Sequence, residues 1–237
     1  GGTVKHMLGL KCIHDIVVNA MDYLNIDIPV ALHLDHGTTR EACEAAIDAG
    51  FSSIMFDGSH LPFNENLAIT RHLVELAHSK SISVEAELGT IAGSEDGIVN
   101  SEVIYADPQE CYTLVKETQV DCLAAALGST HGLYKGKAKL GFTEMKTISE
   151  LVKVPLVLHG GTGIADDDMR KAIACGTAKI NVNTENMYAW CQEVKAIFAA
   201  DTGHDVNDPR KVINQGLKPV REMIARRIEL FGSQNRY

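Results

Sequence analysis

A chain of 237 residues with 45% apolar side chains is long enough to bury one large core, and we expect residues 1–237 to form a single domain. The formal net charge of −9 argues against nucleic acid as a partner, because the chain would repel a phosphate backbone. The sequence has no apolar run as long as a membrane span and no Cys-x-x-Cys pair, so we expect a cytoplasmic protein that contacts no membrane.

Strand-like apolar runs alternate with helical stretches along the chain. The first element is a helical segment over about 4–24. The expected strands cover residues 30–35, 52–57, 82–88, 121–127, 155–159 and 178–183. The helix after the first strand begins with capping-box spacing, from Thr38 to Glu41, and a later helix begins at Asp107 before Pro108. This alternation predicts a parallel sheet built from βα units.

Two strand-to-helix connections, 89–106 and 128–142, are long and glycine-rich, and in a barrel such loops lie on the catalytic face. Six strands are too few to close an eight-stranded barrel, and the first residue is Gly1 rather than methionine. One interpretation is an α/β (β/α)8 TIM barrel that lacks its first two βα units. The alternative is an open, doubly wound sheet of six strands.

Three histidines each end a strand-like segment and are each followed by glycine. They are His36, His131 and His159. Because the carboxyl ends of parallel strands meet at one edge, three imidazoles there would converge on one metal ion and leave a position open for water or substrate.

Asp35 and His36 are neighbours, and adjacent side chains in a strand point to opposite faces. Both can reach one pocket only if the strand breaks there, which Gly37 would permit. The alternative makes Asp35 a helix cap and His36 a loop residue. His33 shares the face of Asp35 one pleat deeper, and we expect it to be a hydrogen-bonded core histidine.

Glu85 and Glu87 alternate with apolar residues, so both face one side of their strand. Two carboxylates on one buried face are costly unless they are paired or bind a metal, which favours a site. The loop residue Glu95 lies between Gly93 and Gly97, which could act as hinges.

The segment Gly160–Gly163 directly precedes a helix that is expected to begin near Asp166. Glycines with a hydroxyl at a helix N-terminus can hold a phosphate, because unpaired N–H groups point at the anion. Asn181, Asn183 and Thr184 add amides and a hydroxyl beside this segment, although Thr184 could equally be a helix N-cap. Lys135 could neutralise a phosphate or be an ordinary surface charge.

Seven motifs follow one another along the chain. They are Leu34-Asp-His-Gly37, Asp57-Gly-Ser59, Glu85-Ala-Glu-Leu-Gly89, Gly93-Ser-Glu-Asp-Gly97, Ser129-Thr-His-Gly132, Leu158-His-Gly-Gly-Thr-Gly163 and Lys179-Ile-Asn-Val-Asn-Thr184. Together they resemble the class II, zinc-dependent fructose-bisphosphate aldolases, over essentially the whole chain. The resemblance implies a (β/α)8 barrel, a homodimer or homotetramer, and reversible cleavage of fructose 1,6-bisphosphate through an enediolate stabilised by Zn²⁺.

The resemblance also implies a role for each candidate residue. Zn²⁺ would be bound by His36, His131 and His159, with Glu87 able to approach it. Asp35 would transfer the proton on the aldehyde side of the breaking bond, and Glu95 the proton at the nucleophilic carbon. The ketose end and its phosphate would be held by Gly132, Lys135, Gly160, Gly161, Thr162, Asn181, Asn183 and Thr184, often beside Na⁺ or K⁺. Arg226 of a neighbouring subunit, or else Arg227, would reach the second phosphate.

Other functions remain open at this point. Tagatose 1,6-bisphosphate or another phosphorylated ketose could be the substrate of such an aldolase. A zinc hydrolase on a similar barrel would instead begin with His-x-His, whereas His33 and His36 are three residues apart. A non-catalytic fragment that binds phosphosugars is the alternative of another class.

Overall fold

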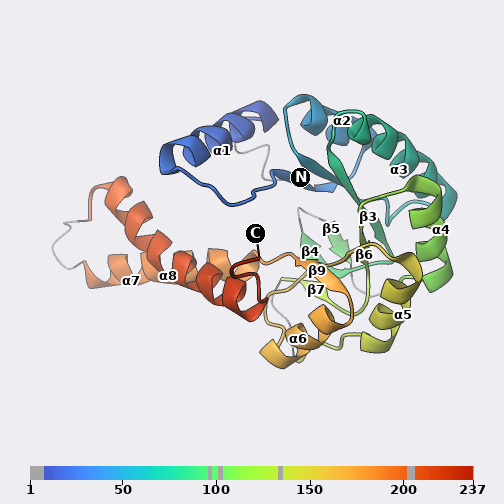
Figure 1. Ribbon diagram of the computed structural model, residues 1–237. Coiled ribbons are helices and arrows are strands. Elements are labelled where there is room, and N and C mark those ends of the chain that lie inside the picture. Colours follow the sequence, from blue (N-terminus) through green and yellow to red (C-terminus); the bar gives the residue numbers. More distant parts are fainter. Residues whose placement is uncertain (1–7, 96–97, 101–103, 133–135, 202–205, 237) are drawn as a thin grey trace.

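The computed structural model describes residues 8–95, 98–100, 104–132, 136–201 and 206–236. Its main feature is a parallel sheet of six strands that lie in chain order (Figure 1). The strands are β1 (His33–Gly37), β2 (Ser53–Phe56), β3 (Ser83–Leu88), β6 (Cys122–Ala125), β8 (Leu156–Leu158) and β9 (Thr177–Ile180). All six predicted strands are confirmed, each slightly shorter or shifted.

The order of the strands distinguishes the two expected architectures. A doubly wound sheet reverses its strand order part-way across, whereas here every strand pairs with the next main-sheet strand along the chain. The doubly wound alternative is therefore wrong. The sheet is half of a barrel, with β1 and β9 at its two edges in the described part of the chain.

Helices cover the convex side of this half-barrel (Figure 1). They are α2 (Arg40–Asp48), α3 (Phe63–His78), α4 (Pro108–Thr118), α5 (Phe142–Val152) and α6 (Asp166–Ala174). Helix α1 (Leu10–Leu24) precedes the sheet, and α7 (Thr184–Ala200) and α8 (Pro209–Leu230) form a hairpin after it. A small second sheet joins β4 (Ala92–Glu95), β5 (Ile98–Asn100) and β7 (Thr130–His131).

The predicted helix starts are partly confirmed. Asp107 is the N-cap of α4 and accepts hydrogen bonds from the backbone N–H groups of the next turn, with Pro108 as the first helical residue. The capping box at Thr38 is wrong by one residue. The N-cap of α2 is Thr39, whose hydroxyl accepts from the Ala42 N–H, because Thr39 is the last extended residue before the helix.

The two faces of the sheet differ in polarity. Side chains such as Ile54, Ala86 and Leu123 pack into the large core under the outer helices. Among the described residues, the concave side has a small apolar cluster that contains Met55, Ala124 and Val157. Charged and imidazole groups such as Glu85, His159 and Lys179 meet on the same side, because the period of two along each strand points alternate side chains to the inside of the half-barrel.

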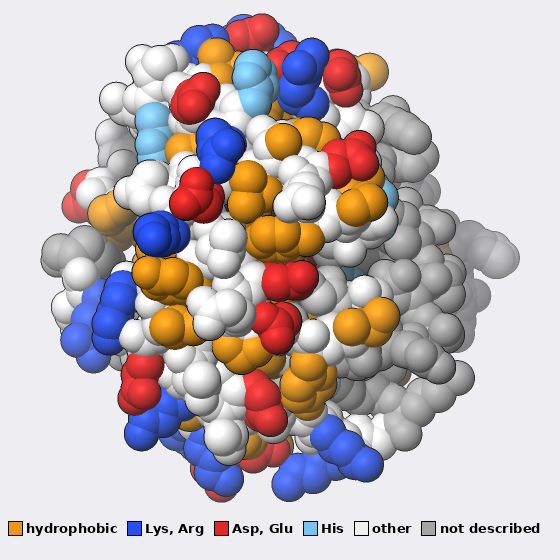
Figure 2. Space-filling model, turned by 90° about the vertical axis from the view of Figure 1, so that its right-hand side faces the viewer, with side chains coloured by type: hydrophobic (Ala, Val, Ile, Leu, Met, Phe, Trp, Pro, Cys, Tyr) orange, Lys and Arg blue, Asp and Glu red, His pale blue; other side chains and the backbone are white. Residues whose placement is uncertain are grey.

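The outer surface over the helices differs from the concave side, because no single type of side chain predominates on the part that Figure 2 shows in colour. Figure 2 shows acidic, basic and apolar groups interspersed over it. Among the described residues, no helix combines the length and apolar character needed to cross a membrane.

Candidate metal centre and substrate pocket

The site begins with an unusual backbone conformation at the end of β1. His36 has a φ of +48°, in the left-handed region that a residue with a Cβ rarely adopts. The pairing of β1 with β2 is irregular between Leu34 and Gly37. The expected irregularity of the strand is therefore present, and the residue in the left-handed region is His36 itself. Such strain costs about 1–3 kcal/mol and is typical of functional sites.

This break lets Asp35 and His36 face the same interior. Gly37 is needed for another reason, because a Cβ there would lie 2.6 Å from both the Cys43 sulfur and the Met55 carbonyl oxygen. The close approach of β1 to its neighbours thus requires glycine after the histidine.

The three predicted histidines come together on the concave side. A ring nitrogen from each of His36, His131 and His159 lies within 4.8 Å of one from each of the other two. Nε2 of His36 is 2.9 Å from Nδ1 of His159. The rings meet edge to face, with centroids 4.7 to 5.9 Å apart. The sequence prediction that these histidines converge is confirmed as geometry.

Two carboxylates fix the orientation of two of these rings. Nδ1 of His36 donates to Asp57 at 2.9 Å, and Nε2 of His159 donates to Glu85 at 2.8 Å. Burial, the largest single influence, raises the pKa of each carboxyl, but the imidazole hydrogen bonds together with the other nearby donors and positive charges outweigh it and lower the pKa of both to about 2. Both groups are ionised acceptors, so each ring keeps its proton on the carboxylate side.

As a consequence, Nε2 of His36 and Nδ1 of His159 face each other at hydrogen-bond distance, while the carboxylates fix the opposite nitrogens of both rings. Each facing nitrogen belongs to a ring whose other nitrogen already donates to an anion. A cation between them, a shared proton or a metal, relieves the repulsion of their electron pairs. The donor set therefore fits a metal that takes imidazole ligands, such as Zn²⁺.

Glu87 is a second group that suits a cation. Its side chain is 2% exposed, and Oε2 has no hydrogen-bond partner among the described residues. Burial, followed by the negative charge of Asp57, raises the pKa of Glu87 well above its usual value. Together with His36 and Asp57 it forms another group of closely spaced ligand atoms. A buried carboxylate in this setting is stabilised when a cation arrives.

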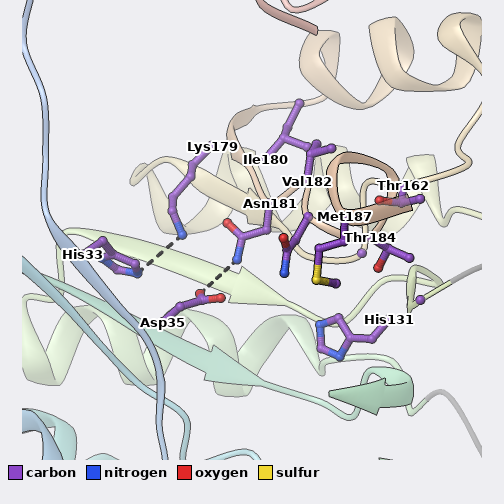
Figure 3. Close-up of a pocket in the computed structure, with 13 residues that line it drawn as sticks. His33, Asp35, His131, Thr162, Lys179, Ile180, Asn181, Val182, Thr184 and Met187 are labelled. Atoms are coloured by element: carbon purple, nitrogen blue, oxygen red, sulfur yellow. Dashed lines mark hydrogen bonds between the residues drawn. The ribbon is translucent and has the colours of Figure 1, made fainter. Parts of the chain in front are cut away.

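A pocket of about 620 Å³ is lined by one of these three histidines, His131, and by Asp35 (Figure 3). Asp35 lies on its wall and accepts a hydrogen bond of 2.9 Å from the Asn181 amide, from the opposite edge of the sheet. The interpretation of Asp35 as a helix cap is wrong, since Thr39 caps α2. His33 donates to or accepts from Ser53 at 2.8 Å, which confirms that it is a hydrogen-bonded histidine of the interior.

The other end of the pocket combines glycines with small polar residues. It is lined by Gly132, Gly160, Thr162, Asn183 and Thr184. Gly160 has a φ of +65°, and a Cβ there would lie well inside 3.0 Å of the Thr130 carbonyl oxygen. Glycine is therefore required where this segment meets the neighbouring loop.

The helix N-terminus that meets this pocket is that of α7. The N-cap of α7 is Asn183, so the alternative that Thr184 is the N-cap is wrong. The Glu185 N–H of the first turn donates to the Thr162 hydroxyl at 3.4 Å. Helix α6 does begin at Asp166, but its first turn carries three aspartates, which disfavour an anion. The first turn of α7 carries one acidic residue, Glu185, whose carboxylate is paired with Arg227, so it opposes an anion in this pocket less than the first turn of α6 does.

Comparison with known proteins adds an independent observation. The model of a protein family described as fructose-bisphosphate aldolase class II matches residues 1–236. The chain belongs to the class II fructose-bisphosphate aldolase family. Members of this family are zinc-dependent carbon–carbon lyases, and the histidine and carboxylate groups described above are the ones that suit such a metal.

Curated relatives and solved structures agree with this assignment. Fructose-bisphosphate aldolases from Geobacillus stearothermophilus and Staphylococcus aureus are 51% and 52% identical over 235 residues, which is 99% of this chain and 81% or 82% of each relative. The crystal structure of the YdjI aldolase from Escherichia coli has a TM-score of 0.80 at 33% identity, covering 95% of this chain and 77% of that one. A fructose-bisphosphate aldolase from Campylobacter jejuni, at 23% identity and a TM-score of 0.81, shows the same TIM-barrel-like fold, over 98% of this chain and 78% of that one.

Some residues predicted for the site lie away from the pocket or outside the described residues. Gly161 does not line the pocket, and its N–H instead donates to the Asn181 carbonyl at 2.9 Å. Lys135 and the side chain of Glu95 lie outside the described residues.

The two candidate arginines are both on α8. Arg227 is held by Glu185 of the same chain, with Nη2 2.6 Å from a carboxylate oxygen, so within this chain it serves an ion pair. Arg226 is exposed, and its guanidinium contacts the sulfur of Met223.

Sequence reasoning assigned no role to two residues that contact the candidate site. Asp57 ends the second strand and holds His36 in orientation. The signal was available, since an acidic residue at the carboxyl end of a barrel strand is a candidate by position. Lys179 lines the pocket and binds Glu85, but a single lysine in a strand gives no signal that it points inward.

Proposed function

We propose that this chain catalyses the reversible cleavage of fructose 1,6-bisphosphate into dihydroxyacetone phosphate and glyceraldehyde 3-phosphate, with Zn²⁺ bound by His36, His131 and His159. The observation that carries the proposal is the convergence of these three imidazoles within 4.8 Å, at the side of a pocket of about 620 Å³. Zn²⁺, when bound, would polarise the ketone and favour loss of a proton beside it.

The chain's own residues supply the metal's surroundings. Asp57 and Glu85 keep two of the ligand rings in one orientation, so little reorganisation accompanies binding. Glu87, buried beside His36, would be a further ligand or a resting position for the metal.

Two carboxylates would move protons. Asp35 lies in the pocket wall, held by Asn181, where it can exchange a proton with the oxygen on the aldehyde side of the bond. Glu95, at the end of β4, would exchange the proton at the nucleophilic carbon.

The phosphate of the ketose end would lie against Gly132, Gly160, Thr162, Asn183 and Thr184. These residues form the end of the pocket at the first turn of α7, where N–H groups and the helix dipole favour an anion. We infer that Asn181, the neighbouring Gly161, Lys135 and a monovalent cation, Na⁺ or K⁺, complete this end.

We further infer a homodimer or homotetramer in which Arg226 reaches the second phosphate of a neighbouring site. The α7–α8 hairpin supports association, because side chains such as Met187, Phe198 and Ile213 are more than half exposed. Light scattering on the purified chain tests this, and a monomer at micromolar concentration would contradict it.

Two coarser features complete the proposal. The sequential strand order supports a single domain whose six main-sheet strands are six of the eight strands of a (β/α)8 barrel. The scattered cysteines, all free, support a reducing compartment, and we place the enzyme in the cytoplasm.

A coupled assay of triose phosphate formation tests the substrate. We expect cleavage of fructose 1,6-bisphosphate with a higher kcat/KM than of tagatose 1,6-bisphosphate. The reverse ranking would make the chain an aldolase for the other epimer. Binding of either sugar without cleavage in the presence of zinc would instead establish the non-catalytic alternative.

A further inference from the structure

Glu85 and Lys179 form an ion pair inside the half-barrel. Glu85 lies on β3 and is 0% exposed, and Lys179 lies on β9. Nζ of Lys179 donates to Oε2 of Glu85 at 2.7 Å. Two strands stand between β3 and β9, so in a flat sheet they would be about 14 Å apart. The pair therefore spans the concave side and joins distant strands.

The second oxygen of Glu85 is engaged by a metal-site histidine. Oε1 accepts from Nε2 of His159 at 2.8 Å, so each carboxylate oxygen has one strong donor. The opposite nitrogen of the same ring, Nδ1, faces His36. A line of contacts thus runs from Lys179 through Glu85 to the atom of His159 that faces the metal position.

Lys179 lies where the line meets the pocket. It belongs to the pocket wall together with His33, whose Nε2 is 3.5 Å from Nζ (Figure 3). Its side chain is 34% exposed, whereas that of Glu85 is fully enclosed. The positive charge therefore compensates the buried carboxylate from the solvent-facing side.

We propose that Lys179 and Glu85 are positioning residues that set the strength of His159 as a metal ligand. This inference rests on the proposed function, because it requires zinc to bind at His159. A carboxylate behind a ligand histidine fixes the tautomer and ring orientation, and loss of such a partner typically weakens metal binding by about 10- to 100-fold. Lys179 extends this support, because without it the buried charge of Glu85 would lose its cation and keep only the weak Cys122 thiol donor, at 3.8 Å, on Oε2.

The expected result concerns zinc affinity. Lys179→Met removes the charge and the donor but keeps most of the side-chain volume, so we expect zinc to bind about 10- to 100-fold more weakly. Affinity is measured on the purified full chain by competition with a chromophoric zinc chelator. The visible spectrum of the Co²⁺-substituted protein is expected to change as well, since it reports the ligand geometry.

Two variants provide controls. Lys171→Met removes a surface lysine that pairs with Asp168 at 3.6 Å, and it should bind zinc like the unmodified chain. Lys179→Arg retains the charge and should restore most of the affinity. If Lys179→Met does not fold, Glu85→Gln is measured instead. The amide introduced by this variant would offer one oxygen to the two donors, His159 and Lys179, so we expect zinc to bind about 10- to 100-fold more weakly here too.

The outcomes separate this inference from the proposed function. If the unmodified chain binds no zinc, the proposed function fails. If it binds zinc and Lys179→Met, or Glu85→Gln in its place, binds less than about 10-fold more weakly, the positioning role is wrong. A rise in KM with unchanged zinc affinity would also overturn it, because Lys179 would then act on the substrate directly.

Discussion

His159→Ala is expected to abolish zinc retention. His159 is buried, and its ring links Glu85 on one side to His36 on the other, so the substitution removes a ligand and leaves Oε1 of Glu85 without its donor. Loss of an outer partner alone costs about 10- to 100-fold in metal affinity, and loss of the ligand itself should cost more. Zinc content after dialysis against a weak chelator measures the effect.

The matched control is His72→Ala. His72 lies on the outer helix α3, where it pairs with Glu44 and is about half exposed. It should retain zinc as the unmodified chain does. Retention of zinc by a folded His159→Ala protein would show that the three histidines are not the metal centre.

Asp35→Asn is expected to leave zinc bound but to lower kcat for cleavage by about 10²- to 10⁴-fold, the usual contribution of a general acid or base. The change is nearly isosteric, and the new amide oxygen can still accept from Asn181. The expected loss therefore reflects proton transfer rather than a disrupted pocket. The measurement is the rate of triose phosphate formation with zinc content determined on the same sample.

Glu95→Gln separates the two proton transfers. The exchange of a carbon-bound proton of dihydroxyacetone phosphate with solvent requires only the step assigned to Glu95. We expect Asp35→Asn to retain this exchange and Glu95→Gln to lose it. Near-normal cleavage by Asp35→Asn would remove Asp35 from the mechanism, and exchange lost in both variants would contradict the division of roles.

The strands of the sheet could be predicted from sequence because each strand is determined by residues that are close together in the chain. Apolar side chains at alternate positions and short helix-to-strand turns mark each strand, and the convergence of strand ends follows from parallel order. The three histidines and the face shared by Glu85 and Glu87 were predictable for that reason.

What could not be predicted depends on contacts between distant strands. The left-handed backbone at His36 lies where the pairing of β1 with β2 is irregular. The conformational preference of histidine does not predict it. The inward direction of Lys179 depends on a partner 94 residues away. The glycines before α6 are visible in sequence, whereas the approach of the first turn of α7 to the same end of the pocket is not.

The central claim is that cleavage requires a metal held by the three histidines. The most direct test is to titrate the purified chain with a strong chelator while following both bound zinc and cleavage of fructose 1,6-bisphosphate. We predict that activity falls in proportion to bound zinc and returns when Zn²⁺ is restored. Cleavage that persists in the fully zinc-free protein would contradict the account.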